Sequence, residues 1–187
     1  MRILGVSGSL RADSQNTRLL AAASRLLPDD VEYVRFEALK AIPPFDEDDE
    51  AAPGPAVDAW REAIASADGL LFATPEYNSS IPGQLKNAVD WASRPFADTV
   101  LRNKPAAVIG ASPSMFGAVW AQAELRKALA AAGARVVDLE LPVANAEEAF
   151  GDNGGLAEVE LEERLAGILA ELRDSAERHA AARAPAA

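Results

Sequence analysis

Three segments of the sequence carry polar side chains directly after short apolar runs, where a ligand can be held. The first reads SGSLRADSQNT over residues 7–17 and supplies hydroxyl and amide donors, one arginine and the start of a helix pattern. Backbone N–H groups at a helix start and a guanidinium fork are the donors that a phosphate needs. This segment predicts a phosphate site; the alternative is that Ser14 or Asn16 simply caps the helix.

The first segment matches neither of the common nucleotide-binding motifs. GxxxxGK[ST] with its lysine is absent, and so is GxGxxG. The segment therefore lacks the lysine that P-loop enzymes use in phosphoryl transfer. Residues 5–9, GVSGS, also fail the last position of the serine-hydrolase pattern GxSxG, and the only histidine, His179, lies near the end of the chain. We do not expect a serine hydrolase.

The second segment, TPEYNSSIPG over residues 74–83, places an acid, a ring and an amide next to one another. Glu76, Tyr77 and Asn78 would suit a planar heterocycle that carries donors and acceptors. The alternative is a polar turn with a half-buried tyrosine. Trp91, in the helix pattern that follows, is expected to pack in the core rather than contact a ligand.

The third segment, ASPSMFGA over residues 111–118, combines small polar residues with large apolar ones. Met115, Phe116 and the nearby Trp120 could wall one side of a flat ligand. Ordinary packing of a loop onto the core explains the same residues equally well.

Short apolar runs alternate with helix patterns along the chain, which predicts a parallel sheet covered by helices. The expected strands are residues 2–6, 31–36, 69–74, 105–111 and 135–139, and the expected helices are 16–27, 56–67, 82–93, 118–132 and one from about 156 onward. Ligands bind such sheets at the carboxyl ends of the strands, where the strand order reverses. Each polar segment follows an expected strand, so the fold brings all three to one edge.

One well-packed domain is expected over residues 1–187, with an alanine-rich end that frays from about residue 175. The acidic run from Asp46 to Glu50 interrupts the alternation of strands and helices. Its simplest interpretation is a solvated loop, and the alternative is a loop near the site or a subunit interface.

The composition excludes several classes of function. A formal net charge of −11 and a pI near 4.6 oppose binding to nucleic acids and anionic membranes, so neither is expected as a partner. Without cysteine and with one histidine, the chain cannot build a thiolate or multi-histidine metal site, and we predict no metal site, although carboxylates leave hard cations open. No run approaches a membrane span and no signal-peptide pattern follows Met1, so we expect a cytoplasmic protein.

Two of these segments resemble a known family, the NAD(P)H-dependent FMN reductases, which include quinone, azo-dye and chromate reductases. GSLRADSQNTRLL is similar to the family's G-S-L-R-x-x-S-x-N phosphate loop. PEYNSSIPGQLKNAVDW is similar to P-E-Y-N-x-S-x-P-G-x-L-K-N-x-x-D-W almost position by position, and IPPFDEDDE resembles the family's loop after the second strand. The third segment departs from S-P-G-x-x-G-G-x-R-A-Q, with Ser114, Ala118 and Trp120 in place of two glycines and an arginine.

The resemblance implies a flavodoxin-like α/β fold, a doubly wound three-layer structure with a five-stranded parallel sheet in the order 2-1-3-4-5. It also implies that the first segment binds the phosphate of FMN, that the second lines the isoalloxazine, and that Ser112 lies close to the ring or ribityl chain. The implied cofactor-binding residues are Ser9, Arg11, Ser14, Asn16, Thr17, Pro75, Glu76, Tyr77, Asn78 and Ser112.

The function that follows from the resemblance is that of an oxidoreductase. It would pass hydride from NADPH or NADH through flavin N5 to a small acceptor such as a quinone, free flavin, azo compound or metal oxyanion. The flavin carries the electron chemistry, so no catalytic side chain is named. The alternatives are a flavodoxin-like electron carrier without reductase activity and a cofactor-free binding subunit. The resemblance also implies a homodimer or homotetramer, with Trp60, Trp91 and the acidic run as candidate contributors.

Overall fold

A parallel sheet with the strand order β2-β1-β3-β4-β5 forms the centre of the computed structural model, which describes residues 1–183. Its strands are β1 (Arg2–Ser7), β2 (Glu32–Phe36), β3 (Gly69–Thr74), β4 (Pro105–Ala111), β5 (Arg135–Val136) and β6 (Pro142–Val143). Every pairing is parallel, and β1 lies between β2 and β3. This order confirms the predicted flavodoxin-like topology and places the switch point beside β1.

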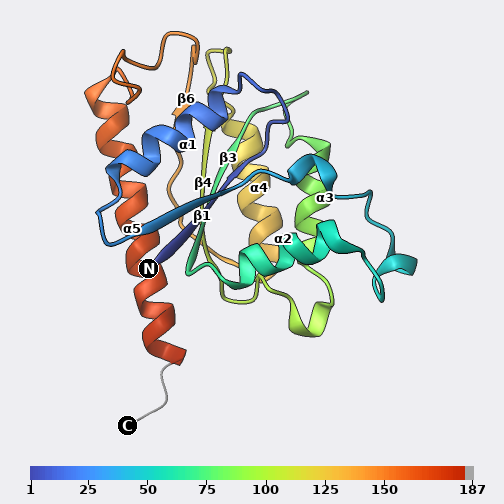
Figure 1. The fold of residues 1–187 in the computed structure, drawn as a ribbon. Coiled ribbons are helices and arrows are strands. Elements are labelled where there is room, and N and C mark those ends of the chain that lie inside the picture. The colour runs from blue at the N-terminus through green and yellow to red at the C-terminus, as the bar shows by residue number, and fades with distance from the viewer. Residues whose placement is uncertain (184–187) are drawn as a thin grey trace.

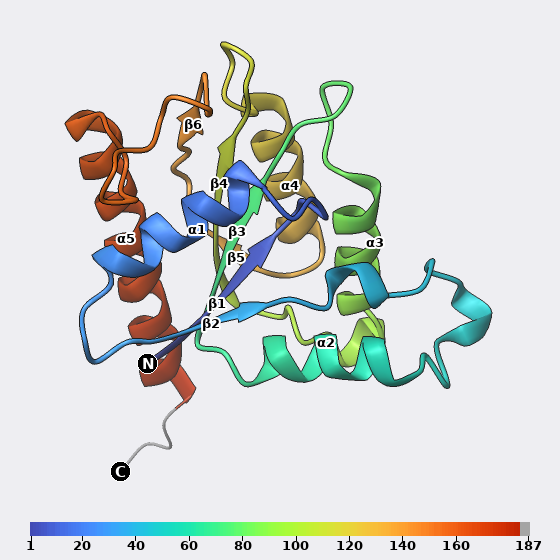
Figure 2. The same cartoon turned by 45° about the horizontal axis from the view of Figure 1, so that its top comes forward.

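Helices cover both faces of the sheet (Figures 1 and 2). One face carries α1 and α5, and the other carries α2, α3 and α4. Three short 3₁₀ turns, η1, η2 and η3, lie in the connections. The bounds are α1 (Gln15–Leu26), η1 (Leu39–Ala41), η2 (Glu47–Asp49), α2 (Pro55–Ala65), α3 (Gly83–Ala92), η3 (Phe96–Asp98), α4 (Val119–Ala131) and α5 (Val159–Arg183).

The core is divided by the sheet into two apolar clusters. Along β1, Leu4 and Val6 pack toward α2 and α3, whereas Ile3 packs toward α1 and α5. The same alternation holds for β3 and β4, whose residues are all buried. Strands buried on both faces have no polar positions, which explains why their sequences are continuous apolar runs.

The edge strand differs from the prediction of one strand over residues 135–139. The structure pairs Arg135 and Val136 with β4, interrupts the ladder, and resumes it at Pro142–Val143. The buried side chain of Gln122 accepts a hydrogen bond from the N–H of Leu141 at 3.1 Å, where a continuous strand would pair with β4. The sixth strand is therefore the second half of one interrupted edge strand.

The last helix, α5, continues to Arg183, so residues 175–183 are helical where the sequence predicts fraying. The remainder of that prediction, residues 184–187, lies outside the described residues. Within residues 1–183, no helix combines the length and the apolar character that a bilayer crossing requires.

Residues 46–49 of the acidic run are exposed, as a solvated loop predicts, and contacts on either side of them anchor the run. Phe45, just before it, packs edge-on against Trp91 with ring centroids 4.9 Å apart. The Trp91 indole N–H donates to the carbonyl of Pro43 at 2.8 Å, and Arg94 pairs with Glu50 at 2.9 Å. These contacts hold the segment against α3, at the right-hand edge of the molecule in Figure 1. Trp60 and Trp91 are fully buried, so the expectation that they contribute to a subunit interface is wrong, and Trp91 packs in the core as predicted.

One buried group in the sheet makes the free energy of unfolding depend on pH in the alkaline range. The hydroxyl of Tyr33, on β2, lies over Gly5 of β1 and has no hydrogen-bond partner within residues 1–183. Burial is the main cause that raises the pKa of Tyr33 to about 12, while the nearby Arg35 acts in the opposite direction. The folded chain therefore retains the phenol proton at a pH where the unfolded chain, with a pKa near 10, has lost it.

We expect the free energy of unfolding to fall as pH rises from 10 to 12, by roughly 2–3 kcal/mol from this residue, because each pKa unit is worth about 1.4 kcal/mol. Below pH 10 the phenol is neutral in both states and adds no pH dependence. Tyr33→Phe should remove this loss and, by deleting an unpaired buried hydroxyl, leave stability at neutral pH equal or about 1 kcal/mol higher. Urea unfolding of both proteins at pH 8 and pH 11.5 tests this, and parallel losses in the two would refute it.

Candidate functional site

The three polar segments meet at the carboxyl edge of the sheet, at the upper end of the molecule in Figure 1. They enclose a pocket of about 290 Å³. Eight of the ten residues implied as cofactor ligands line it, namely Ser9, Arg11, Ser14, Asn16, Pro75, Glu76, Tyr77 and Ser112. The structure therefore brings together segments that are up to about a hundred residues apart in sequence, as the strand order requires.

Loop 8–14, which connects β1 to α1, offers unpaired donors at the pocket. The backbone N–H groups of Leu10 and Ala12 in the loop, and of Gln15 at the start of α1, donate to no acceptor within the described chain. The guanidinium of Arg11 is exposed and forms no hydrogen bond or ion pair with another described residue. Free N–H groups at a helix start beside an unpaired guanidinium form a favourable site for an anion.

Ser14 caps the helix that follows the first loop. It is the N-cap of α1, and its hydroxyl accepts hydrogen bonds from the N–H groups of Asn16 and Thr17 at 3.2 and 3.3 Å. The capping alternative is thus correct for Ser14, although the residue also lines the pocket. Capping satisfies the N–H groups of Asn16 and Thr17 and leaves that of Gln15 and those of the preceding loop to meet a ligand.

Asn16 and Thr17 tie the first loop to its surroundings. The side-chain amide of Asn16 donates to the carbonyl of Ala111 and accepts from its N–H, both at 2.9 Å, and so joins α1 to the end of β4. The Thr17 hydroxyl donates to the hydroxyl of Ser7 at 3.1 Å and does not line the pocket. Both residues position the loop, and their polar atoms are already used within the protein.

The second segment forms a tight hairpin. Tyr77 and Ser80 exchange backbone hydrogen bonds at 3.0 and 3.1 Å, and the two residues between them, Asn78 and Ser79, have φ of 53° and 59°. Positive φ at both central positions is the signature of a type I′ turn, which asparagine tolerates well. Asn78 is exposed at the tip and outside the pocket lining, whereas Tyr77, which is 49% exposed, forms part of the wall.

Two glutamates clamp this hairpin to α4. The carboxylate of Glu76 accepts hydrogen bonds from the N–H groups of Trp120 and Ala121, both at 3.1 Å. In return, the carboxylate of Glu124 on α4 accepts from the hydroxyl of Ser80 at 2.6 Å and from the N–H of Ile81 at 3.3 Å. Since the N-cap residue of α4 is an alanine with no capping side chain, Glu76 supplies the missing cap from another element.

The third segment closes the pocket through its first residues only. Ser112 and Pro113 line the pocket, and the Ser112 hydroxyl accepts from the N–H of Ser114 at 3.1 Å. Met115, Phe116 and Trp120 lie outside the pocket lining and remain exposed, so the possibility that they wall this pocket is not realised. The Phe116 and Trp120 rings pack on each other with centroids 4.8 Å apart.

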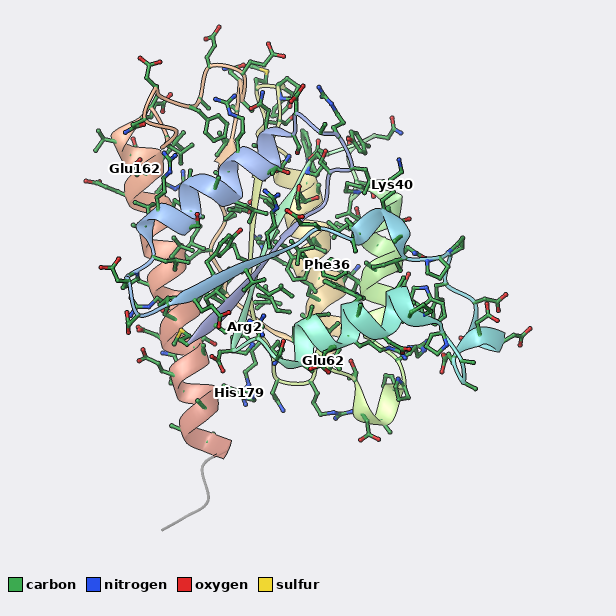
Figure 3. All side chains as sticks on the ribbon, viewed as in Figure 1. Arg2, Phe36, Lys40, Glu62, Glu162 and His179 are labelled. Atoms are coloured by element: carbon green, nitrogen blue, oxygen red, sulfur yellow. The ribbon has the colours of Figure 1, made fainter. Side chains whose placement is uncertain are left out.

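Three lining residues were not predicted from the sequence: Gln15, Ala111 and Pro113. Each is a direct neighbour of a predicted residue, so the rule that placed the others at strand ends and at the helix start would also have found them. His179 lies on α5 at the end of the molecule that carries Arg2, opposite the polar loops (Figure 3). From this position the only histidine of the chain cannot serve as a base for Ser7 or Ser9.

The role of Glu76 as a cap gives a testable prediction. Glu76→Ala is expected to lower the free energy of unfolding of the protein without FMN by about 1–2 kcal/mol, because two helix N–H groups lose their acceptor. Hydrogen exchange should become faster at residues 120 and 121. Urea unfolding and exchange measured by mass spectrometry provide the two readouts.

The matched control is Glu62→Ala, an exposed glutamate on α2 that Figure 3 labels far from the hairpin, and it should leave both readouts unchanged. If Glu76→Ala instead leaves the FMN-free protein as stable as the parent and only weakens FMN binding, the carboxylate contacts the cofactor and does not act through α4.

The fold and the pocket together define a flavodoxin-like protein with an anion-binding loop beside a wall that suits a flat ring. The family model of the NADPH-dependent FMN reductases matches residues 1–148. The chain belongs to this family, which identifies it as an oxidoreductase that uses FMN and a nicotinamide nucleotide.

Relatives of known name agree with this assignment. The chain is 42% identical to an NAD(P)H-dependent FMN reductase of Pseudomonas aeruginosa over 158 residues, which cover 83% of this chain and 84% of that protein. It is 44% identical to a 2-hydroxy-1,4-benzoquinone reductase of a Burkholderia species over 126 residues, covering 67% and 68%. Among solved structures, FerB, a flavoenzyme NAD(P)H:(acceptor) oxidoreductase from Paracoccus denitrificans, matches with a TM-score of 0.83 and 33% identity over 95% of this chain and 98% of that chain.

Proposed function

We propose that this chain passes hydride from NAD(P)H through FMN to a small acceptor of the quinone class. The observation that carries the proposal is the pocket itself, which is lined by Arg11, by Gln15 with its unpaired N–H group, and by Tyr77. Names of relatives support the acceptor class, since they include reductases of a benzoquinone and of quinones.

The residues present fit FMN. Arg11, the hydroxyl of Ser9 and the free N–H groups of loop 8–14 would hold the phosphate, because these donors have no acceptor among residues 1–183. Pro75, Tyr77 and Ser112 would line the ring. Glu76 and Asn16 would act through the positions of α4 and β4, since their polar atoms bond to backbone groups there. When bound, FMN supplies the electron chemistry, and the protein's part is to bind, orient and limit access.

The test is the visible spectrum of the purified protein with FMN, followed without oxygen after mixing with NADPH or with NADH. Bound flavin that is bleached by a nicotinamide nucleotide and recovers its colour on addition of a benzoquinone is the expected result. Bound flavin that stays oxidised with both nucleotides would contradict the reductase and favour an electron carrier. Absence of any FMN binding would contradict both.

We also propose that the chain forms a homodimer or homotetramer in the cytoplasm, where its nucleotide donor is found. Support comes from exposed apolar side chains on the third segment and the start of α4, with Met115 at 73%, Phe116 at 50% and Trp120 at 46% exposure. Clustered apolar exposure of this kind is typical of a surface that another protein covers. Analytical ultracentrifugation of the parent and of Phe116→Glu tests this, because a monomeric parent would contradict it.

A further inference from the structure

A second hollow lies on the other side of loop 8–14. This hollow, called the β2 cleft below, has a volume of about 350 Å³ and is bounded by loop 8–14 and by the segment from the end of β2 to η1. It shares Ser9 and Arg11 with the FMN pocket, so the two hollows meet at the loop. In Figure 3, Lys40 stands on η1, on the side of the molecule where loop 8–14 lies.

The β2 cleft collects positive charge in a strongly acidic protein. Arg11, Arg35 and Lys40 all line it, although the chain has only 18 basic residues against 29 acidic ones and a net charge of −11. The side chains of Arg11 and Lys40 form no ion pair or hydrogen bond with any residue of the described chain. Glu37 is the one carboxylate among the lining residues, so the cleft carries a net positive charge that an anionic ligand would offset.

The chemistry and position of the cleft indicate which anion it suits. Guanidinium forks and a lysine are the groups that recognise a phosphate monoester. The electron donor must place its reactive ring at the flavin. A donor that also reaches the β2 cleft must be elongated, and it must carry a phosphate at the end away from that ring. NADPH has this form, and it differs from NADH only by the monoester phosphate on the 2′ oxygen of its adenosine ribose.

We propose that the β2 cleft binds the 2′-phosphate of NADPH through Arg35 and Lys40, and that the enzyme therefore prefers NADPH to NADH. The inference rests on the proposed function, because it assumes that a nicotinamide nucleotide is the electron donor. Arg11 lines both hollows and would then lie close to both phosphates.

Glu37 opposes this binding and so gives a test with the opposite sign. Its carboxylate lines the cleft and pairs with Arg35 at 2.5 Å, with 72% of its side chain exposed. A phosphate in the cleft must compete with this carboxylate for the Arg35 guanidinium. Removing the charge by Glu37→Gln should therefore strengthen binding of the phosphate, whereas Lys40→Ala and Arg35→Ala should weaken it.

The experiment titrates the FMN-loaded protein with adenosine 2′,5′-bisphosphate and with 5′-AMP, which lacks the 2′-phosphate, by calorimetry. In the parent protein the bisphosphate should bind about tenfold more tightly. Lys40→Ala should reduce this preference to about threefold or less, and Glu37→Gln should increase it. The control Lys127→Ala removes an exposed lysine of α4 outside the cleft and should change nothing. The ratio of kcat/KM for NADPH over NADH should follow the same order.

Three results would overturn the inference. Equal affinity of the parent for the two adenosine nucleotides would show that the cleft ignores the 2′-phosphate. A tenfold loss of FMN affinity in Lys40→Ala would assign the cleft to the cofactor. An equal effect of Lys127→Ala would show that the preference for the bisphosphate comes from the general surface charge and not from the cleft. Failure of the proposed function looks different, because the flavin would then be reduced by neither NADPH nor NADH.

Discussion

Replacing Arg11 by alanine is expected to weaken FMN binding about 10- to 100-fold while leaving the fold intact. A charge-assisted hydrogen bond to a phosphate is worth roughly 1.5–3 kcal/mol, and each 1.4 kcal/mol is about tenfold in affinity. The Arg11 side chain is exposed and has no partner within residues 1–183, so its removal should change the free energy of unfolding of the FMN-free protein by less than about 0.5 kcal/mol. Fluorescence titration with FMN and urea unfolding measure the two quantities.

Riboflavin separates a phosphate contact from any other effect of this substitution. It carries the same ring and ribityl chain without the phosphate, so Arg11→Ala should leave riboflavin affinity unchanged. Arg11→Lys should fall between the parent and the alanine variant for FMN, since it keeps the charge but loses the fork. Arg135→Ala, at the opposite end of the sheet, serves as the matched control. Equal losses for FMN and riboflavin in Arg11→Ala would place the arginine at the ring and contradict the assignment.

The arrangement of the fold was predictable from the sequence because its apolar runs indicate which strands are buried. β1, β3 and β4 are apolar except at their ends, and only a sheet covered on both faces buries such runs. The strand order followed from the resemblance and was confirmed by the pairing. The edge strand could not be predicted in the same way, because its interruption depends on Gln122, a residue of α4 that reaches across to Leu141.

The candidate site was predictable in position but less so in the role of each residue. Polar residues after strand ends must meet at one edge, which the sequence shows. Whether the polar atoms of a given side chain are free to bind a ligand depends on whether neighbouring groups already form hydrogen bonds with them. The side chain of Asn16 bonds to the backbone of Ala111. The carboxylate of Glu76 bonds to α4, because the N-cap residue of α4, Ala118, has no side chain that can cap it. Neither partner is close in sequence, so no local pattern reports these bonds.

The largest expected effect on stability comes from Gly117, which precedes α4. Its φ is +57°, and a Cβ placed on it would lie 2.5 Å from the carbonyl carbon of Pro142 and 2.7 Å from the nitrogen of Val143. Both contacts are with backbone atoms of β6, which cannot move aside as a flexible side chain can. A left-handed residue with a Cβ costs about 1–2 kcal/mol, and overpacking adds typically about 1–3 kcal/mol.

We therefore expect Gly117→Ala to lower the free energy of unfolding by about 2–5 kcal/mol, a large share of the roughly 5–15 kcal/mol that stabilises a typical domain. The third segment connects Ser112 to α4, so its displacement from β6 should also weaken FMN binding in the variant that remains folded. Urea unfolding and FMN titration of the same preparations measure both effects.

The control is a glycine of opposite character in the same chain. Gly167 lies inside α5, its φ is not positive, and a Cβ added to it would meet no atom of the described chain within 4 Å. Gly167→Ala should therefore stabilise the protein by about 0.5–1 kcal/mol, because alanine restricts the unfolded chain and favours the helix. Opposite signs for the two substitutions would attribute the loss at Gly117 to its left-handed backbone and its contact with β6. If Gly117→Ala lowers the free energy of unfolding by no more than about 1 kcal/mol, β6 moves to accommodate the added Cβ. The third segment is then not held in place by its contact with β6.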